Sequence, residues 1–125
     1  YNHQGQLGLN DRTQRSSPVQ LPGTNWKSLS HMNNHTIATK TDGTLWSWGY
    51  GSSGQLAQNN RTNYSSPVQV PGTTWNRVFP SSSHNSAATK TDGTLWMWGS
   101  NNNGVLAQNN QTSYSSSNTW YYMEW

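Results

Sequence analysis

Short stretches of this chain alternate between hydrophobic and polar residues, which is the pattern of half-buried β-strands. Residues 35–40 alternate in this way, and in residues 44–48 Leu45 faces the side opposite to Trp46 and Trp48. No stretch keeps hydrophobic residues at the three- and four-residue spacing of a helix. The pattern therefore predicts an all-β protein.

Four short strands are predicted in each structural unit. They cover about residues 19–21 (copied at 68–70), 26–30, 35–40 and 44–48. The pair Asp42-Gly43 lies between the last two strands and returns as Asp92-Gly93. This pair suits a two-residue turn that requires positive φ, so it predicts a hairpin in each unit.

The chain repeats itself at an interval of about 50 residues, which indicates a repeat architecture. The run TKTDGTLWSWG at residues 39–49 returns as TKTDGTLWMWG at residues 89–99. The run SSPVQ at residues 16–20 returns at residues 65–69, one residue sooner than the later run does. The difference places one inserted residue near residues 79–85. The predicted units are a partial repeat at residues 1–26, a repeat at 27–75 and a repeat with a degenerate end at 76–125.

Four strands per repeat is the make-up of a propeller blade. The predicted fold is thus an all-β propeller with blades of four antiparallel strands, of which about two and a half blades are present. Tryptophans recur at fixed places in each repeat, as Trp26 and Trp75 do, and are expected to fill the space between neighbouring blades.

One phrase resembles a known repeat. His35-Thr36-Ile37-Ala38 is followed by TDGTLWSWG at residues 41–49 and by Gly-Gln-Leu at residues 54–56. This order is similar to the repeat of the regulator of chromosome condensation family, and the resemblance covers residues 1–114. It implies a seven-bladed propeller that acts as a rigid interaction surface, with nucleotide exchange on a small GTPase and inhibition of partner enzymes among the family's activities.

The resemblance also implies which residues carry the motif. Ala57, Ala107 and Val105 depart from it, and His84 stands one residue too far from Asp92. The motif positions are Asp42, Gly43, Trp46, Trp48, Gly49, Gly54, Asp92, Gly93, Trp96, Trp98, Gly99 and Gly104.

Composition narrows the classes further. Of the 125 residues, 30% are hydrophobic and 9% are charged, and the chain has eight tryptophans and no cysteine. The core must therefore be aromatic, and a disulfide framework and a thiolate zinc site are excluded. No hydrophobic run is long enough to span a membrane. The net charge of +3 comes from scattered basic residues, so a nucleic-acid partner is not expected.

Candidate catalytic groups are few. Asp42 and Asp92 are assigned to turns, and Asp11 aligns with Asn60 and Asn110 in the other copies. The four histidines, His3, His31, His35 and His84, do not form a metal-ligand pattern on the predicted strands. We therefore expect no catalytic residue, no metal and no cofactor, and a protein that is not an enzyme.

The number of blades is a separate question. Propellers close with about four to eight blades, so two and a half blades leave open faces. The remaining blades could come from a longer chain of about 350 residues, or from other copies of this chain in a symmetric ring. The sequence favours the longer chain. The aromatic stretch at residues 120–125 is expected to be a degenerate last blade, or else a docking strand.

The functional expectation is a scaffold that binds a protein partner or a surface receptor through its loops. The composition, rich in Asn, Ser, Thr and Trp, suggests an extracellular or virion-surface component such as a phage fibre, with the cytoplasm as the alternative location. One alternative function is a glycan-binding lectin that uses Tyr50, Tyr64 and Tyr114. The other, an exchange factor or chromatin binder, rests on the family resemblance. Four glycosylation acceptor motifs occur, at Asn34, Asn60, Asn63 and Asn110.

Overall fold

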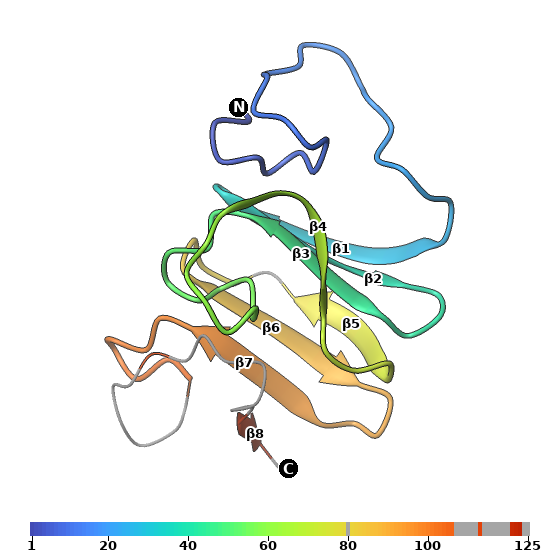
Figure 1. Ribbon diagram of the computed structural model, residues 1–125. Coiled ribbons are helices and arrows are strands. Elements are labelled where there is room, and N and C mark those ends of the chain that lie inside the picture. The colour runs from blue at the N-terminus through green and yellow to red at the C-terminus, as the bar shows by residue number, and fades with distance from the viewer. Residues whose placement is uncertain (80, 107–112, 114–120, 124–125) are drawn as a thin grey trace.

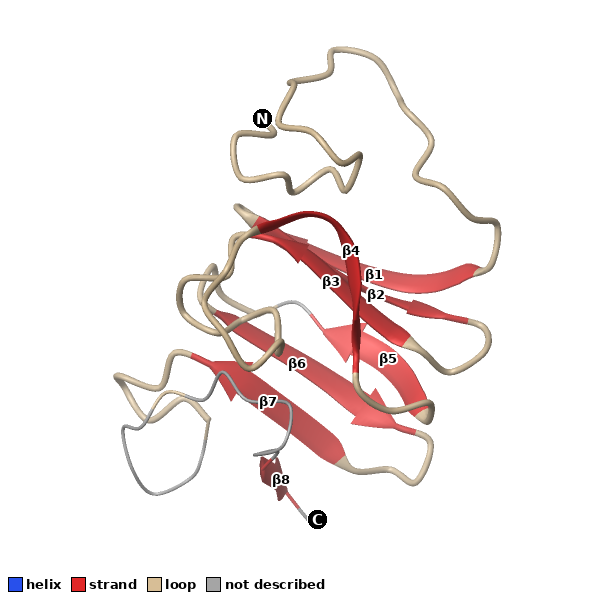
Figure 2. Ribbon diagram, in the orientation of Figure 1, coloured by secondary structure: helices blue, strands red, loops and turns tan. Residues whose placement is uncertain are grey.

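The computed structural model describes residues 1–79, 81–106, 113 and 121–123. These residues form two four-stranded antiparallel sheets stacked face to face, as the ribbon views show (Figures 1 and 2). The first sheet contains β1 (Trp26–Met32), β2 (His35–Lys40), β3 (Leu45–Gly49) and β4 (Tyr64–Val70). The second contains β5 (Trp75–Phe79), β6 (Asn85–Lys90), β7 (Leu95–Gly99) and β8 (Tyr121–Met123). The all-β prediction and the blade of four strands are confirmed.

Strand order within each sheet follows the chain, and every neighbouring pair is antiparallel. Leu29 pairs with Ala38, and Ala38 pairs with Trp46, which places these three side chains on one face of the first sheet. Ile37 and Leu45 lie on the other face. The predicted alternation of the two sides is confirmed.

The prediction of a strand at residues 19–21 is wrong. Residues 1–25 contain no strand, and their trace lies above the first sheet (Figure 1). The copy at residues 68–70 does belong to a strand, but that strand is β4, which ends the first sheet by pairing with β3 through Val70 and Leu45. The described residues contain no strand before residue 19 to which 19–21 could pair in the same way.

The Asp-Gly turn differs from the expected two-residue form. The Lys40 amide donates to the Thr44 carbonyl at 2.9 Å and the Gly43 amide donates to the Lys40 carbonyl at 3.1 Å, which leaves a three-residue loop. Gly43 has φ of 85°, and Asp42 does not have positive φ. This is a turn closed by a glycine bulge, and it is favoured because Asp42 Oδ1 accepts from both the amide and the hydroxyl of Thr44.

The core lies between the two sheets. Ile37, Leu45 and Val70 of the first sheet pack against residues of the second that include Trp75 and Trp98. Both indoles are almost fully buried, and their ring centroids lie 6.0 Å apart. The prediction that tryptophans fill the space between blades is confirmed here. No helix of the described residues is long and apolar enough to cross a membrane.

Candidate interaction face

The loops at one end of both sheets form the surface that the sequence analysis singled out. We call this surface the loop end, and it comprises residues 33–34, 50–63, 81–84 and 100–106, with the chain's first residues, 1–13, in the same position above the first sheet. The Asp-Gly turns lie at the opposite end of the strands (Figure 1). The loop end is therefore held by the sheets and is separate from the turns.

A backbone carbonyl in each Gly-Gln-Leu phrase fastens the loop end to the sheet. The Gln6 carbonyl accepts hydrogen bonds from the Trp48 indole at 2.8 Å and the Thr36 hydroxyl at 3.0 Å. The Gln55 carbonyl accepts from the equivalent groups of the next repeat, the indole of Trp98 at 2.9 Å and a serine hydroxyl at 2.8 Å. We call each of these carbonyls, with its two donors, a clamp. Each clamp joins one repeat to the following sheet, so the next blade holds the loop in position.

The glutamine side chains add a second attachment. Gln55 donates through Nε2 to the Ser83 carbonyl at 3.1 Å and accepts at Oε1 from the Ser53 amide at 2.9 Å. Gln6 makes the corresponding donation to the Asn33 carbonyl at 3.3 Å. Gln55 is fully buried, and its side-chain amide joins its own loop to the loop that contains Ser83.

His35 connects the two sheets beneath the loops. It is 1% exposed, and its Nε2 lies 3.0 Å from the hydroxyl of Ser86 on β6. Its Nδ1 is buried with no hydrogen-bond partner among the described residues. Burial, with a smaller repulsion from His31, lowers the pKa of His35 to about 4. His35 is thus neutral at pH 7, which fits a structural role.

A polar cleft of about 500 Å³ opens at the loop end between the two blades. Its lining includes Ser53, Ser82, His84, Asn85, Ser100 and Asn102. A second hollow next to it is lined by Arg61 together with Ser53, Ser100 and Asn102. The cleft therefore offers hydroxyl and amide groups, with one arginine and one histidine at its border.

The comparisons with known proteins agree with this architecture. The model of the regulator of chromosome condensation repeat matches residues 42–86. The match covers the Asp-Gly turn of the first sheet and the beginning of the second sheet, so this segment is similar to the repeat of that family.

Among the solved structures similar to this chain are three propellers, one human and two from yeast. Human WBSCR16 is 20% identical with a TM-score of 0.76, and matches 99% of this chain and 33% of its own. Prp20p from Saccharomyces cerevisiae, in a structure described with its binding to Gsp1p and histones, is 16% identical with a TM-score of 0.75 over 99% of this chain and 33% of its own. Yeast Prp20 bound to Kap60 is 18% identical with a TM-score of 0.74 over 93% of this chain and 30% of its own. The chain thus spans about a third of these structures, and it fits a partial propeller. A comparison with curated proteins gives no match.

The tyrosines predicted to bind a glycan lie at the loop end of the first sheet. Tyr64 begins β4 and pairs with Gly49, directly before Tyr50. Both tyrosines are partly buried, and the Tyr64 hydroxyl accepts from Asn60 at 3.0 Å. Tyr114 lies outside the described residues. Their role in glycan binding stays a prediction.

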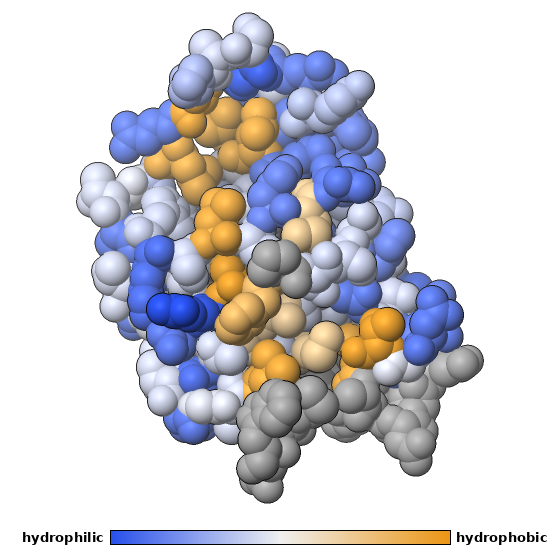
Figure 3. Space-filling view, turned by 180° about the vertical axis from the view of Figure 1, so that it is seen from behind, coloured by the Kyte–Doolittle hydropathy of each residue, from blue (hydrophilic) through white to orange (hydrophobic). Residues whose placement is uncertain are grey.

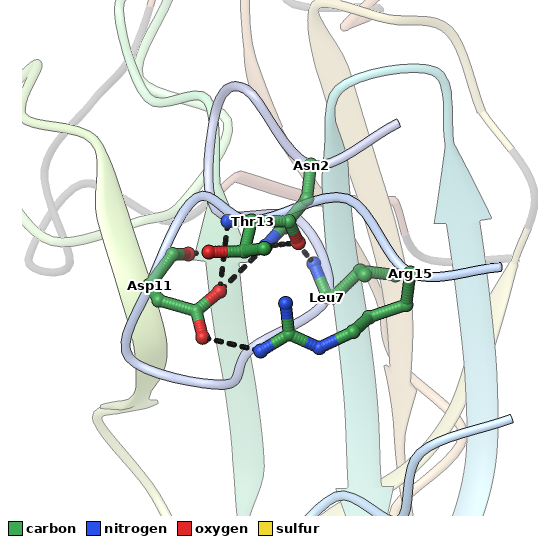
Figure 4. Close-up of polar contacts among 5 residues, drawn as sticks. All are labelled: Asn2, Leu7, Asp11, Thr13 and Arg15. Atoms are coloured by element: carbon green, nitrogen blue, oxygen red, sulfur yellow. Dashed lines mark hydrogen bonds and ion pairs between the residues drawn. The ribbon is translucent and has the colours of Figure 1, made fainter. Parts of the chain in front are cut away.

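The acidic residues of these repeats have structural partners. Asp11 forms an ion pair with Arg15 at 2.7 Å and accepts from the Asn2 side chain at 3.1 Å, in a cluster that closes the first loop (Figure 4). Hydrogen bonds from Thr44 lower the pKa of Asp42, and Thr94 does the same for Asp92. The described residues contain no group of three or more metal-ligating side chains.

The remaining motif positions have defined places in the repeat. Trp46 and Trp96 donate through their indoles to the threonine after each Asp-Gly pair. Gly49 and Gly99 end β3 and β7 at positive φ. A side chain at either position would meet the backbone at the start of the paired strand, β2 or β6. Gly54 and Gly104 close the turn that precedes each leucine, with their amides bonded to residues three positions earlier.

The sequence analysis missed two features of the repeat, one at the loop end and one beside the Asp-Gly turn. The first is the carbonyl clamp, because a backbone acceptor leaves no trace in residue type. The second is Lys40, whose ammonium lies 4.7 Å from the ring centre of Trp26 and 4.3 Å from that of Trp46. Lys90 occupies the same place in the second sheet. The lysine that precedes each Thr-Asp-Gly was the available signal.

Proposed function

We propose that this chain supplies adjacent blades of a propeller scaffold that binds a protein partner through the loop end. The observation that carries the proposal is the polar cleft of about 500 Å³ between the blades, where Gln55 holds the loop of Ser53 through the Trp98 indole and the loop of Ser82 and His84 through the Ser83 carbonyl. A rigid frame under varied polar loops lowers the entropy cost of binding.

The charges of the loop end narrow the partner's chemistry. Arg61 is exposed there, and His84 is exposed at the cleft. The carboxylate of Asp11 is engaged by Arg15 at 2.7 Å. A neutral or acidic protein surface therefore fits the loop end better than a basic one.

The family likeness supplies two candidate partner classes. The structure of Prp20p is described with binding to Gsp1p and to histones. The second candidate function is accordingly nucleotide exchange on a small GTPase, and the charges of the loop end favour this class over histones.

Binding of purified Gsp1p and of core histones to the immobilised chain tests the proposal. We expect Gsp1p to bind and Arg61→Glu to weaken that binding about tenfold, because a tenfold change is about 1.4 kcal/mol, the size of a charged contact. Asp92→Asn, at the opposite end of the strands, is the matched control and should leave binding unchanged. Failure of Gsp1p to bind, or equal losses in both variants, would contradict the proposed face. Acceleration of GDP release from Gsp1p by the chain would support the second candidate.

The other expectations remain predictions. An extracellular or virion-surface location, a surface receptor and a non-enzymatic role rest on composition and on the motif analysis. Glycan binding through Tyr50 and Tyr64 is tested by a glycan array with Tyr64→Ala as the comparison. Binding that this variant abolishes would support a lectin, and silence across the array would exclude it.

A further inference from the structure

Hydrophobic and hydrophilic residues occupy different parts of the molecular surface. Seen from behind, hydrophobic residues form an interrupted band down the molecule, and mostly hydrophilic residues border this band (Figure 3). The two hollows of the loop end are hydrophilic as well, because Val105 is the only hydrophobic residue that lines either of them. The loop end is therefore suited to a polar ligand.

The smaller of these hollows lies between two neighbouring loops. The first of the two loops, residues 50–63, follows β3, and the second begins at residue 100, after β7. The hollow measures about 160 Å³, which is several times the roughly 30 Å³ that one water molecule occupies in the liquid. We call it the Arg61 hollow. Its lining consists of Ser52, Ser53, Arg61, Ser100, Asn102 and Ser113.

The lining of the Arg61 hollow offers hydrogen-bond donors and one positive charge. Four of the six lining residues are serines, whose hydroxyls can donate, and the amide of Asn102 can donate as well. Arg61 is the only charged residue at positions 50–63, and positions 100–113 contain no charged residue. An anion that accepts several hydrogen bonds therefore matches this lining and meets no carboxylate in either loop.

The equivalent place between the preceding pair of loops is closed by a direct hydrogen bond. The Asn63 side chain donates through Nδ2 to Oε1 of Gln4 at 2.8 Å, and so joins residues 50–63 to residues 1–13. One repeat later, Ser113 and Ser53 stand at these two positions. Both serines have shorter side chains, and the place of the amide-to-amide contact is a space lined by hydroxyls.

The backbone beside this space is held in the same way in both repeats. The Ser113 Oγ accepts from the Asn101 amide at 3.0 Å, and the Asn63 Oδ1 accepts from the Gly51 amide at 2.8 Å. The hollow thus results from two shorter side chains on a retained loop attachment. Its walls are in place without a ligand, which lowers the entropy cost of binding one.

The loop of Arg61 has also lost a carboxylate that the first loop contains. In the first loop Asp11 pairs with Arg15 at 2.7 Å (Figure 4). One repeat later Asn60 and Tyr64 stand at these positions, and Asn60 donates to the Tyr64 hydroxyl at 3.0 Å. The contact is kept without charge, so the positive charge of Arg61 is not balanced within its own loop.

We propose that the Arg61 hollow binds a phosphate group, which bridges the two loops where the Asn63–Gln4 contact bridges the preceding pair. A phosphate group carries a charge of about −1.5 to −2 at pH 7 and has three acceptor oxygens, which suit a guanidinium surrounded by hydroxyls. A carboxylate has only two oxygens, and a neutral sugar does not balance the charge of Arg61. The phosphate group belongs to a free anion or to a phosphorylated side chain, and its binding does not depend on the protein partner proposed above.

Titration of the isotopically labelled chain with inorganic phosphate, followed by NMR at constant ionic strength, tests the site. We expect the backbone amide signals of Ser53, Ser100 and Asn102 to shift and saturate with phosphate but not with chloride. Arg61→Gln should weaken phosphate binding about tenfold, because it removes a charge-assisted contact. Arg12→Gln is the matched control: Arg12 is the exposed arginine at the equivalent position of the first loop, and its loss should leave binding unchanged.

A second variant tests the space rather than the charge. Ser53→Gln combined with Ser113→Asn restores the pair of side chains that closes the preceding junction. We expect this double variant to lose phosphate binding although it retains Arg61. Circular dichroism shows whether each variant is folded, and the exposed position of Arg61 makes Arg61→Gln the variant least able to disturb the sheets.

A titration with two short glycine peptides, one with a central phosphoserine and one with a central serine, identifies the source of the phosphate group. Binding of the phosphopeptide at least as tight as that of inorganic phosphate supports a phosphorylated side chain, and binding of inorganic phosphate alone supports a free anion. Absence of saturable phosphate binding, equal losses in Arg61→Gln and Arg12→Gln, or equal binding of the two peptides would overturn the proposal. No protein partner is present in these titrations, so their outcome is independent of whether Gsp1p binds.

Discussion

The buried imidazole of His35 gives a pH dependence of stability that one substitution should remove. His35 lies between the sheets, 1% exposed, with Nδ1 unpaired among the described residues. The change we consider is His35→Asn. Asn85 already occupies the equivalent place in β6, where its side chain donates to the Ser100 carbonyl and accepts from the Ser82 hydroxyl. An asparagine is therefore compatible with this position of the repeat.

The sign and size follow from the pKa. Burial lowers the pKa of His35 to about 4 from its ordinary value of 6.5, so between these pH values the unfolded chain binds a proton that the folded chain does not. The contribution of the neutral His35 imidazole to the free energy of unfolding is present above about pH 6.5. It decreases as the pH falls and is lost below about pH 4. A difference of about 2.5 pKa units corresponds to about 3 kcal/mol.

Urea unfolding followed by tryptophan fluorescence, at intervals from pH 7.5 to 4, measures this effect. We expect the wild-type free energy of unfolding to fall by about 3 kcal/mol over the range, and most of this fall to be absent in His35→Asn. His31→Asn is the comparison: partial burial lowers the pKa of His31 as well, so it should remove a smaller part. A His35→Asn profile as steep as that of the wild type would refute the assignment of the pH dependence to this buried imidazole.

Two further pairs of variants test the packing. Gly43→Ala and Gly93→Ala impose the same positive-φ strain, since φ is 85° and 86°, and Gly93→Ala should cost about 1 kcal/mol. Gly43→Ala should cost about 2 kcal/mol more, because its methyl group meets the Thr73 carbonyl; equal costs in thermal unfolding would refute the close approach of the sheets. Trp98→Phe removes a buried donor to the Gln55 carbonyl and should cost about 2 kcal/mol more than Trp96→Phe in the same assay. A reversed order would show that the carbonyl clamp adds little to stability.

The fold was largely predictable from local patterns, because alternation along a strand fixes which side chains share a face. The inserted residue predicted near residues 79–85 is confirmed: Ser30 and Phe79 pair with Ile37 and Ala87, and the longer loop follows Phe79. The pairing of strands depends on segments that are distant in the sequence, so local patterns did not predict it. Residues 19–21 and 68–70 have similar sequences, but only the second segment follows β3, to which it pairs.

The site was less predictable, because its decisive contacts do not depend on residue type. The Gln6 and Gln55 clamps use backbone carbonyls, which every residue carries. The turn at Asp42 is compatible with two loop lengths, and the three-residue form is fixed by where Lys40 and Thr44 pair. The polar cleft brings together loops that are separated by tens of residues, so no local pattern marks it.

The two described blades share the carbonyl clamp but differ in the side chains of their sheet faces. The clamp is the same in both described blades, with Trp48 and Trp98 donating to equivalent carbonyls. The sheet faces are not the same, since Ile37 and Ser47 of one face become Ala87 and Met97 of the next. A constant clamp holds the loops in one geometry, while the changed volumes make each sheet face different. The residues between the sheets and the residues of the exposed loops thus vary around the same clamp, so substitutions in one group need not disturb the other.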